Sequence, residues 1–125
     1  MKFTRIYADE YGESHFEDVE VNFDTIDFAP PAPPLGVSQP TPAQRYRYLR
    51  GPAGWVGDWH PAPERHLMIY LSGEVEAETS DGEIRRFGPG SVILLEDTFG
   101  RGHRSRVLGL TDVLVAVVQL DVPPE

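Results

Sequence analysis

Cysteine is absent from this chain of 125 residues. Disulfides, thiolate metal sites and cysteine nucleophiles are therefore excluded. Long apolar runs are also missing, because none approaches the roughly 20 residues that a membrane-spanning helix needs. The N-terminus lacks the apolar stretch that is typical of a secretory signal peptide. These absences predict a cytoplasmic protein with no membrane partner.

Lysine is nearly absent, since arginine supplies ten of the eleven basic residues. Against 20 acidic residues, the formal net charge is −9. Binding to a nucleic acid needs clustered Lys and Arg side chains, so this charge argues against a nucleic-acid partner. The nearest cluster is Arg101, Arg104 and Arg106 around His103. Strand alternation is expected to turn Arg104 and Arg106 toward solvent, on the opposite face from His103.

A convincing helical period is missing from every window of the sequence. Short apolar or alternating runs are instead separated by Gly, Pro and Asp turns, which is the pattern of a β-sandwich or β-barrel. The Asp81-Gly82 pair is a strong signal for a tight hairpin. We predict strands over residues 44–50, 55–60, 66–71, 74–79, 84–87, 91–95, 103–108 and 113–120. The length of the chain indicates one domain.

We divide the chain into an extended, acidic and proline-rich N-terminal segment (1–43), a β-barrel (44–121) and a short tail (122–125). Residues 19–23 alternate like a half-buried strand. The proline run at 29–34 is expected to be an extended spacer. Aromatic side chains in the segment are expected to dock on the barrel or on a neighbouring subunit. Because two-fold dimers are the commonest oligomers, we expect a homodimer.

Two stretches contain glycine and histidine at regular spacing. In the first, five residues separate Gly54 from His60, and one residue separates His60 from Ala62. Three residues then lead to His66 and six more to Gly73. This stretch resembles the first motif of the cupin superfamily, in which Gly is followed by His-x-His, Glu and Gly. In this chain Ala62 stands at the second His position, and His66 stands where Glu is usual.

The second stretch resembles the second cupin motif, in which Gly is followed by Pro-x-Gly, His and Asn. Five residues separate Gly90 from Glu96, which stands in place of Pro. Two extra residues precede Gly100, and His103 follows it at the usual distance. Val107 replaces Asn. The resemblance covers about half of the chain and implies a jelly-roll β-barrel of the cupin type.

The resemblance also implies a metal site. Cupins usually hold a metal ion with three His and one Glu, and the matching positions of this chain supply His60, His66 and His103. Some cupins use three histidines alone. Imidazole suits a divalent transition metal such as Zn, Fe, Mn, Ni or Cu. Glu64, Glu96 or Asp97 could supply an oxygen ligand instead. A barrel whose histidines are hydrogen-bonded and hold no metal is the alternative.

Strand alternation predicts the rest of the pocket. If His66 points inward, so do Met68 and Tyr70. If His103 points inward, so does Ser105. Upstream of His60 the inward side chains would be Asp58 and Val56, with Trp55 and Trp59 outside, unless a bulge at Gly57 exchanges them. Such a pocket, mostly apolar with a few polar groups, is typical of a small-molecule site.

Two functions remain open at this point. The first is a metal-dependent enzyme acting on a small organic molecule, with Glu96 or Asp97 as base and Tyr70 as a hydrogen-bond donor to the substrate. Lyase, isomerase, decarboxylase and dioxygenase reactions all occur among cupins, and the sequence does not choose between them. The second is a non-catalytic barrel that binds a small ligand without metal. The altered ligand positions favour the second function.

Overall fold

The computed structural model of the chain describes residues 1–122. Within that range it consists of strands, turns and loops, and it contains no helix long and apolar enough to cross a membrane. The prediction of an all-β domain is confirmed. The strands are β1 (Lys2–Ala8), β2 (Ser14–Glu20), β3 (Asp24–Ile26), β4 (Leu35–Val37), β5 (Ala43–Gly51), β6 (Val56–His60), β7 (His66–Ser72), β8 (Glu74–Thr79), β9 (Ile84–Phe87), β10 (Val92–Leu95), β11 (His103–Leu108) and β12 (Val113–Leu120).

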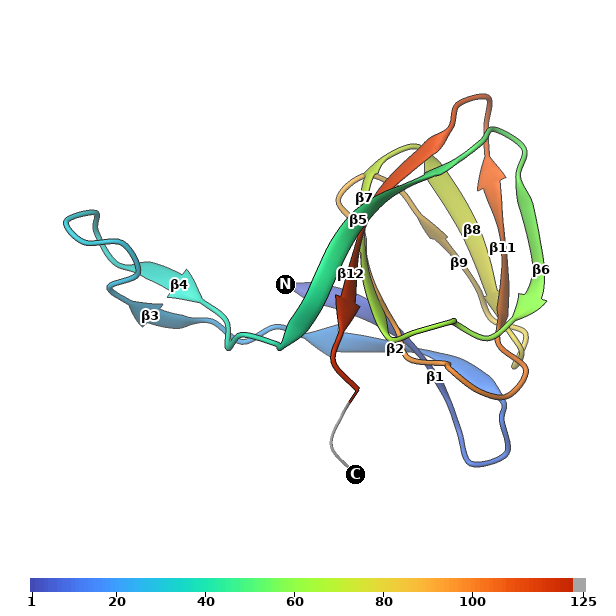
Figure 1. Ribbon diagram of the computed structural model, residues 1–125, viewed down its shortest axis with the longest axis horizontal. Helices are drawn as coiled ribbons and strands as arrows, with labels where there is room; N and C mark the ends of the chain where they lie inside the picture. Colours follow the sequence, from blue (N-terminus) through green and yellow to red (C-terminus); the bar gives the residue numbers. More distant parts are fainter. Residues whose placement is uncertain (123–125) are drawn as a thin grey trace.

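Two sheets face each other across the core (Figure 1). The larger sheet has the order β2-β1-β10-β7-β12-β5, and the smaller has the order β6-β11-β8-β9. All pairings within these sheets are antiparallel except that of β1 with β10. The arrangement is consistent with a jelly roll. It departs from the predicted closed barrel, because no strand pairing among residues 1–122 joins one sheet to the other.

Alternation explains why each sheet has an inner face. In β12 the side chains of Val113, Val115 and Val117 are buried. In β8 the buried side chains include Val75 and Ala77, while the glutamates between them point outward. Such a period of two places every second residue on one face of a sheet. The two inner faces therefore meet in one apolar core, whose deepest residues include Ile6 and Val115.

The first 20 residues belong to the larger sheet. β1 pairs with both β10 and β2, and β2 forms its edge. Ile6 and Phe16 are buried in the common core. The predicted strand over residues 19–23 is therefore found earlier, at β2. The predicted boundary between residues 43 and 44 does not separate the barrel from what precedes it, because β1 and β2 complete the sheet.

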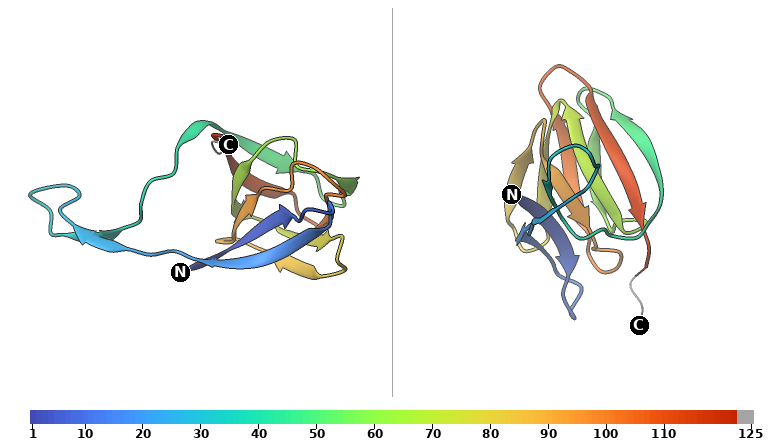
Figure 2. Two further views of the ribbon diagram at one scale, coloured as in Figure 1. Left: turned by 90° about the horizontal axis from the view of Figure 1, so that it is seen from below. Right: turned by 90° about the vertical axis from the view of Figure 1, so that its left-hand side faces the viewer.

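Residues 22–42 form a separate hairpin, which we call the arm. It contains β3 and β4, which pair only with each other among the described strands. The arm projects away from the two sheets on the side of the larger one (Figures 1 and 2). The proline run predicted to be an extended spacer forms the turn of this hairpin, where the Ala32 amide donates to the Ala29 carbonyl at 2.9 Å. Of the predicted tail, residues 123–125 lie outside the described part of the chain.

Candidate functional site: a cavity with three histidines

A cavity of about 650 Å³ lies between the inner faces of the two sheets. Aliphatic and aromatic side chains make up most of its wall, and three imidazoles interrupt it. The larger sheet contributes Ile6, His66, Met68, Tyr70, Ile93, Leu95, Val115 and Val117, and the smaller contributes His60, Val75, Ala77, His103, Ser105 and Val107. A volume of this size suits a small organic molecule.

His60 and His103 are neighbours in the cavity wall. They are partners in the register of β6 and β11, and their ring centroids lie 4.9 Å apart. Gly102, directly before His103, has a φ of 72°, and an added Cβ there would overlap the carbonyl group of His60. Glycine therefore lets the two strands approach closely at this point. The Nδ1 atom of His60 donates to the carbonyl oxygen of Asp58 at 2.7 Å, so Nε2 remains for a ligand.

His103 is oriented by a buried carboxylate. Its Nδ1 atom donates to Oδ2 of Asp97 at 2.6 Å, and Asp97 is fully buried. The other carboxylate oxygen, Oδ1, is buried without a hydrogen-bond partner. The backbone of Asp97 is also fixed, because its carbonyl accepts from the amide of Ala62 at 2.9 Å. Asp97, predicted as a base or an oxygen ligand, instead fixes the tautomer and the ring orientation of His103.

His66 lines the cavity from β7, in the sheet opposite His60 and His103. Its Nε2 atom donates to Oε2 of Glu64 at 3.2 Å, which leaves Nδ1 for a ligand. The cavity thus holds all three predicted histidines. They do not form a preformed three-ligand centre, because residues 1–122 contain no group of three or more His, Cys, Asp or Glu side chains placed to hold a metal ion.

Three other predicted pocket residues line the cavity as alternation requires, namely Met68, Tyr70 and Ser105. Tyr70 is deeply buried, and burial raises the pKa of its hydroxyl to about 12. Near neutral pH the Tyr70 hydroxyl therefore keeps its proton. It can donate a hydrogen bond but cannot act as an anionic base.

Glu96 was predicted to act as a base or an oxygen ligand, but it does not line the cavity. Its two carboxylate oxygens accept from Nε of Arg5 and Nε of Arg65, each at 2.5 Å. Burial acts to raise the pKa of Glu96, but the hydrogen bonds and charges of Arg65 and Arg5 outweigh it, so the pKa is lowered. Glu96 is thus an ionised structural carboxylate that ties β1 to the loop before β7.

A bulge in β6 explains why Asp58 and Val56 are not in the cavity wall. The register changes between the pair His103–His60 and the pair Ser105–Gly57, so β6 contains one extra residue. Such a bulge re-aims the side chains on either side of it. Asp58 is exposed and accepts from its neighbouring amide, and Trp55, expected outside, lines the cavity instead. Sequence alternation alone could not place this bulge, although Gly57 marked where one was possible.

Arg47 was not predicted as a site residue, yet it lines the cavity at its exposed margin. The pairing of Arg47 with Val117 and of Leu49 with Val115 places both β5 side chains on the inner side of the sheet. Within residues 1–122 no ion pair engages Arg47. In the sequence, the apolar residue Leu49 lies on the same face of the strand as Arg47 and could have indicated that this face points inward.

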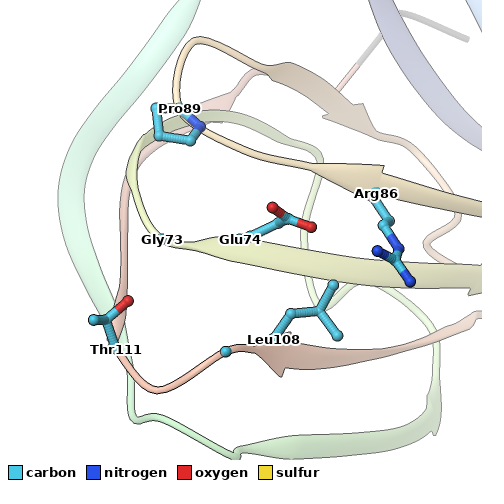
Figure 3. A pocket seen from close by; sticks show the side chains of 7 residues that line it. Gly73, Glu74, Arg86, Pro89, Leu108 and Thr111 are labelled. Atoms are coloured by element: carbon cyan, nitrogen blue, oxygen red, sulfur yellow. The ribbon is translucent and has the colours of Figure 1, made fainter.

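A second hollow lies on the surface (Figure 3). It is lined by residues of β8, β9 and β11 and of the turns next to them, including Glu74, Arg86 and Leu108. It is open to solvent and contains none of the histidines. We therefore place the candidate site in the cavity between the sheets.

No protein-family model and no curated protein sequence gives a significant match to the chain. Several solved structures are similar in fold. A conserved protein of unknown function from Streptococcus pyogenes has 19% identity and a TM-score of 0.46, over 65% of this chain and 70% of its own. The Schizosaccharomyces pombe Cnp3 cupin domain has 14% identity and a TM-score of 0.45, over 96% and 84%. Protein NMB1881 from Neisseria meningitidis has 14% identity and a TM-score of 0.44, over 66% and 84%.

These similarities are too distant to carry an activity from one protein to the other. The facing sheets of this structure, with the two glycine- and histidine-containing stretches on β6, β7, β10 and β11, match the architecture that the sequence motifs imply. The chain therefore has a cupin-like fold.

Proposed function

We propose that this chain binds a small organic molecule in the cavity between its sheets. One observation carries the proposal: a cavity of about 650 Å³, walled mainly by apolar side chains, gathers three histidines from three different strands. Binding sites for small molecules have this composition, an apolar wall with a few polar groups that fix the ligand's orientation. The apolar wall favours a ligand with a hydrocarbon or aromatic body.

The polar groups favour a ligand that also carries an anionic group, such as a carboxylate. Arg47 offers a guanidinium at the cavity margin that has no ion-pair partner among residues 1–122, in a protein whose net charge is −9. Tyr70 offers a protonated hydroxyl deeper inside. Arginine matches a carboxylate with two parallel N–H donors, which adds both strength and direction. A cationic or zwitterionic ligand would find no carboxylate in the wall among the described residues.

His103 is the group best placed for chemistry on the bound molecule. The Asp97 carboxylate holds Nδ1, so Nε2 is the atom that can accept or donate a proton on the cavity side. His60 stands beside it, and Tyr70 can donate a hydrogen bond to an oxygen atom of the ligand. In this arrangement Asp97 is a positioning residue that acts through His103. The result would be proton transfer at a ligand atom, a role for which histidine is commonly used.

Metal-dependent catalysis is the second candidate. One observation favours it: His60 and His103 both donate from Nδ1 to an oxygen atom, which is the usual arrangement of metal-bound histidines. Against it stands the absence of a three-ligand group among residues 1–122. The residues therefore do not fit a preformed three-histidine centre. A divalent transition metal bound at these imidazoles would supply Lewis-acid chemistry to the ligand.

Two measurements on protein purified without a nickel column test these candidates. Calorimetric titration with small aromatic and aliphatic carboxylates should show binding that Arg47→Ala and His103→Ala each weaken. A hydrogen bond to a charged group contributes about 1.5–3 kcal/mol, so the loss should be roughly tenfold to a hundredfold. His15→Ala is the matched control, because His15 lies outside the cavity. Binding that is equal in all four proteins would reject the site.

The second measurement is metal content by mass spectrometry. One equivalent of a transition metal in the wild type, lost in His103→Ala but kept in His15→Ala, would select the metal-dependent candidate. Equal metal in His103→Ala and the wild type would reject that candidate. It would leave ligand binding by hydrogen-bonded histidines, which the titration tests separately.

A further inference from the structure

The cavity between the sheets has two chemically different ends, and the first holds the three histidines. His60 and His103 are register partners in the smaller sheet, and His66 is the first residue of β7 in the larger sheet. β7 and β8 are joined directly at Gly73, so the first residue of β7 lies at the same end as the last residue of β8. That last residue, Thr79, pairs with His103. We call this part of the cavity the histidine end.

The opposite end of the cavity is apolar and includes Trp55. Along β11 the inward side chains run from His103 to Val107, a span of four residues and about 13 Å at the rise of a strand. The amide of Val107 donates to the carbonyl of Trp55 at 2.9 Å, which fixes Trp55 beside Val107. Val75 and Val113 complete the wall there. We call this part the tryptophan end.

The groups that favour an anionic ligand lie on the side of the histidine end. In the larger sheet Arg47 pairs with Val117, and Val117 pairs with Met68. Met68 is two residues from His66 along β7, and Tyr70 is two residues beyond Met68. Arg47 is therefore close to the row of His66, and Tyr70 lies between the two ends. A ligand whose carboxylate is held at Arg47 directs its apolar body toward the tryptophan end.

Gly57 provides the space that the Trp55 indole occupies in the cavity wall. Gly57 pairs in register with Ser105, whose side chain lines the cavity, so a side chain at position 57 would also point inward. An added Cβ on Gly57 would overlap the six-membered ring of Trp55. The φ of Gly57 is not positive, so its backbone conformation does not require glycine. Glycine at this position instead lets the indole lie inside the cavity.

The Trp55 indole is held in place and still has surface to offer. Its backbone is fixed at both polar atoms, because the amide donates to the carbonyl of Pro52 at 3.0 Å and the carbonyl accepts from Val107. Trp55 nevertheless remains 44% exposed. Aromatic rings in offset or edge-to-face contact attract each other beyond the effect of the area they bury. A half-exposed indole at the end of an apolar cavity therefore distinguishes an aromatic ring from a saturated group of similar size.

We propose that Trp55 selects ligands that carry an aromatic ring, with the ring against the indole and the carboxylate at the histidine end. This inference rests on the proposed function, since it requires an anionic small molecule in the cavity. The distance of about 13 Å between the two ends calls for a linker of several atoms between ring and carboxylate. The ligand class is an arylalkanoate. Trp55 determines specificity by direct contact, and Gly57 is a positioning residue that acts through Trp55.

Calorimetric titration with two matched acids, 4-phenylbutanoate and 4-cyclohexylbutanoate, tests the proposal. The quantity measured is the ratio of their dissociation constants, which removes effects common to both ligands. Trp55→Leu should lower the preference for the phenyl acid about twofold to tenfold, the range expected for one aromatic pair. Gly57→Ala should change the ratio in the same direction, because the added methyl group displaces the indole.

Trp59→Leu is the control, because the chain has only two tryptophans and Trp59 is on the outer side of β6. The guanidinium of Arg104 lies 5.0 Å from the centre of its ring, on the face of the sheet that points away from the cavity. Its ratio should equal that of the wild type. Trp55 is not part of the buried core, so circular dichroism of Trp55→Leu should match the wild type.

Tryptophan fluorescence gives a second readout that does not depend on comparing affinities. In Trp59→Phe the emission comes from Trp55 alone, and 4-phenylbutanoate should change it in a saturable manner. In Trp55→Phe, where only Trp59 emits, the same acid should produce no saturable change.

The outcomes separate this inference from the proposed function. Binding of both acids with a ratio that Trp55→Leu leaves unchanged, or that Trp59→Leu changes equally, overturns the role of Trp55 and leaves the cavity as the binding site. A Trp55 emission that does not respond while 4-phenylbutanoate binds also overturns that role. Failure of both acids to bind the wild type rejects the proposed carboxylate ligand, and the inference with it.

Discussion

Replacing Gly102 with alanine tests how His60 and His103 are held side by side. Gly102 has a φ of 72°, and an added Cβ would overlap the backbone carbonyl of His60. The left-handed conformation costs an L residue about 1–2 kcal/mol. Overlap with a backbone that cannot easily move adds about 1–3 kcal/mol. We therefore expect Gly102→Ala to lower the free energy of unfolding by about 2–5 kcal/mol and to separate the two imidazoles.

Gly109→Ala is the matched control for this prediction. Gly109 has a φ of 76°, but an added Cβ there would meet nothing within 4 Å. Only the conformational cost of about 1–2 kcal/mol then applies. Urea unfolding followed by tryptophan fluorescence gives the free energy of unfolding of each protein by linear extrapolation. Equal losses in the two variants would refute the reasoning, because the close approach of β6 and β11 would then contribute nothing.

Two further predictions concern stability. Replacing Ile6, which is 1% exposed, with alanine should lower the free energy of unfolding by about 2–5 kcal/mol. Replacing Ile84, which is 54% exposed, should lower it by less than about 0.5 kcal/mol. Similar losses in the two variants, measured by calorimetry, would contradict the assigned core. The hydrogen bond to Asp9 raises the pKa of His15 although burial acts to lower it. The stabilisation from His15 is therefore complete below about pH 6.5 and is lost as the pH rises through the raised pKa. The stability difference between wild type and His15→Ala, measured by urea unfolding, should shrink as the pH rises above about 6.5. A difference that grows would show that the sign is wrong.

Strands with local signals could be predicted closely from the sequence. The predicted ranges 74–79, 84–87, 103–108 and 113–120 are the observed bounds of β8, β9, β11 and β12. Their alternation and their turn residues are visible within a few positions of each strand. β1 lacked such a signal, because the charged residues on its outer side hid the buried Ile6. Its pairing partner β10 lies far along the chain, and a single sequence does not reveal that contact.

For the candidate site too, the sequence predicted what local strand alternation determines and missed what depends on distant contacts. Alternation correctly placed Met68, Tyr70 and Ser105 in the cavity wall. It could not distinguish Glu96 from Asp97, because their fates depend on contacts outside the motif. Arg5 and Arg65 engage Glu96, whereas Asp97 turns inward to His103.

Histidine side-chain NMR is the measurement that tests the central claim most directly. The chain has four histidines, of which His60, His66 and His103 line the cavity while His15 lies outside it. On titration with small carboxylates that carry an apolar body, the ring signals of the three cavity histidines should shift together and saturate, and those of His15 should not move. Shifts confined to His15, or the absence of saturable shifts at the cavity histidines up to millimolar concentrations, would contradict the assignment of this cavity as the binding site.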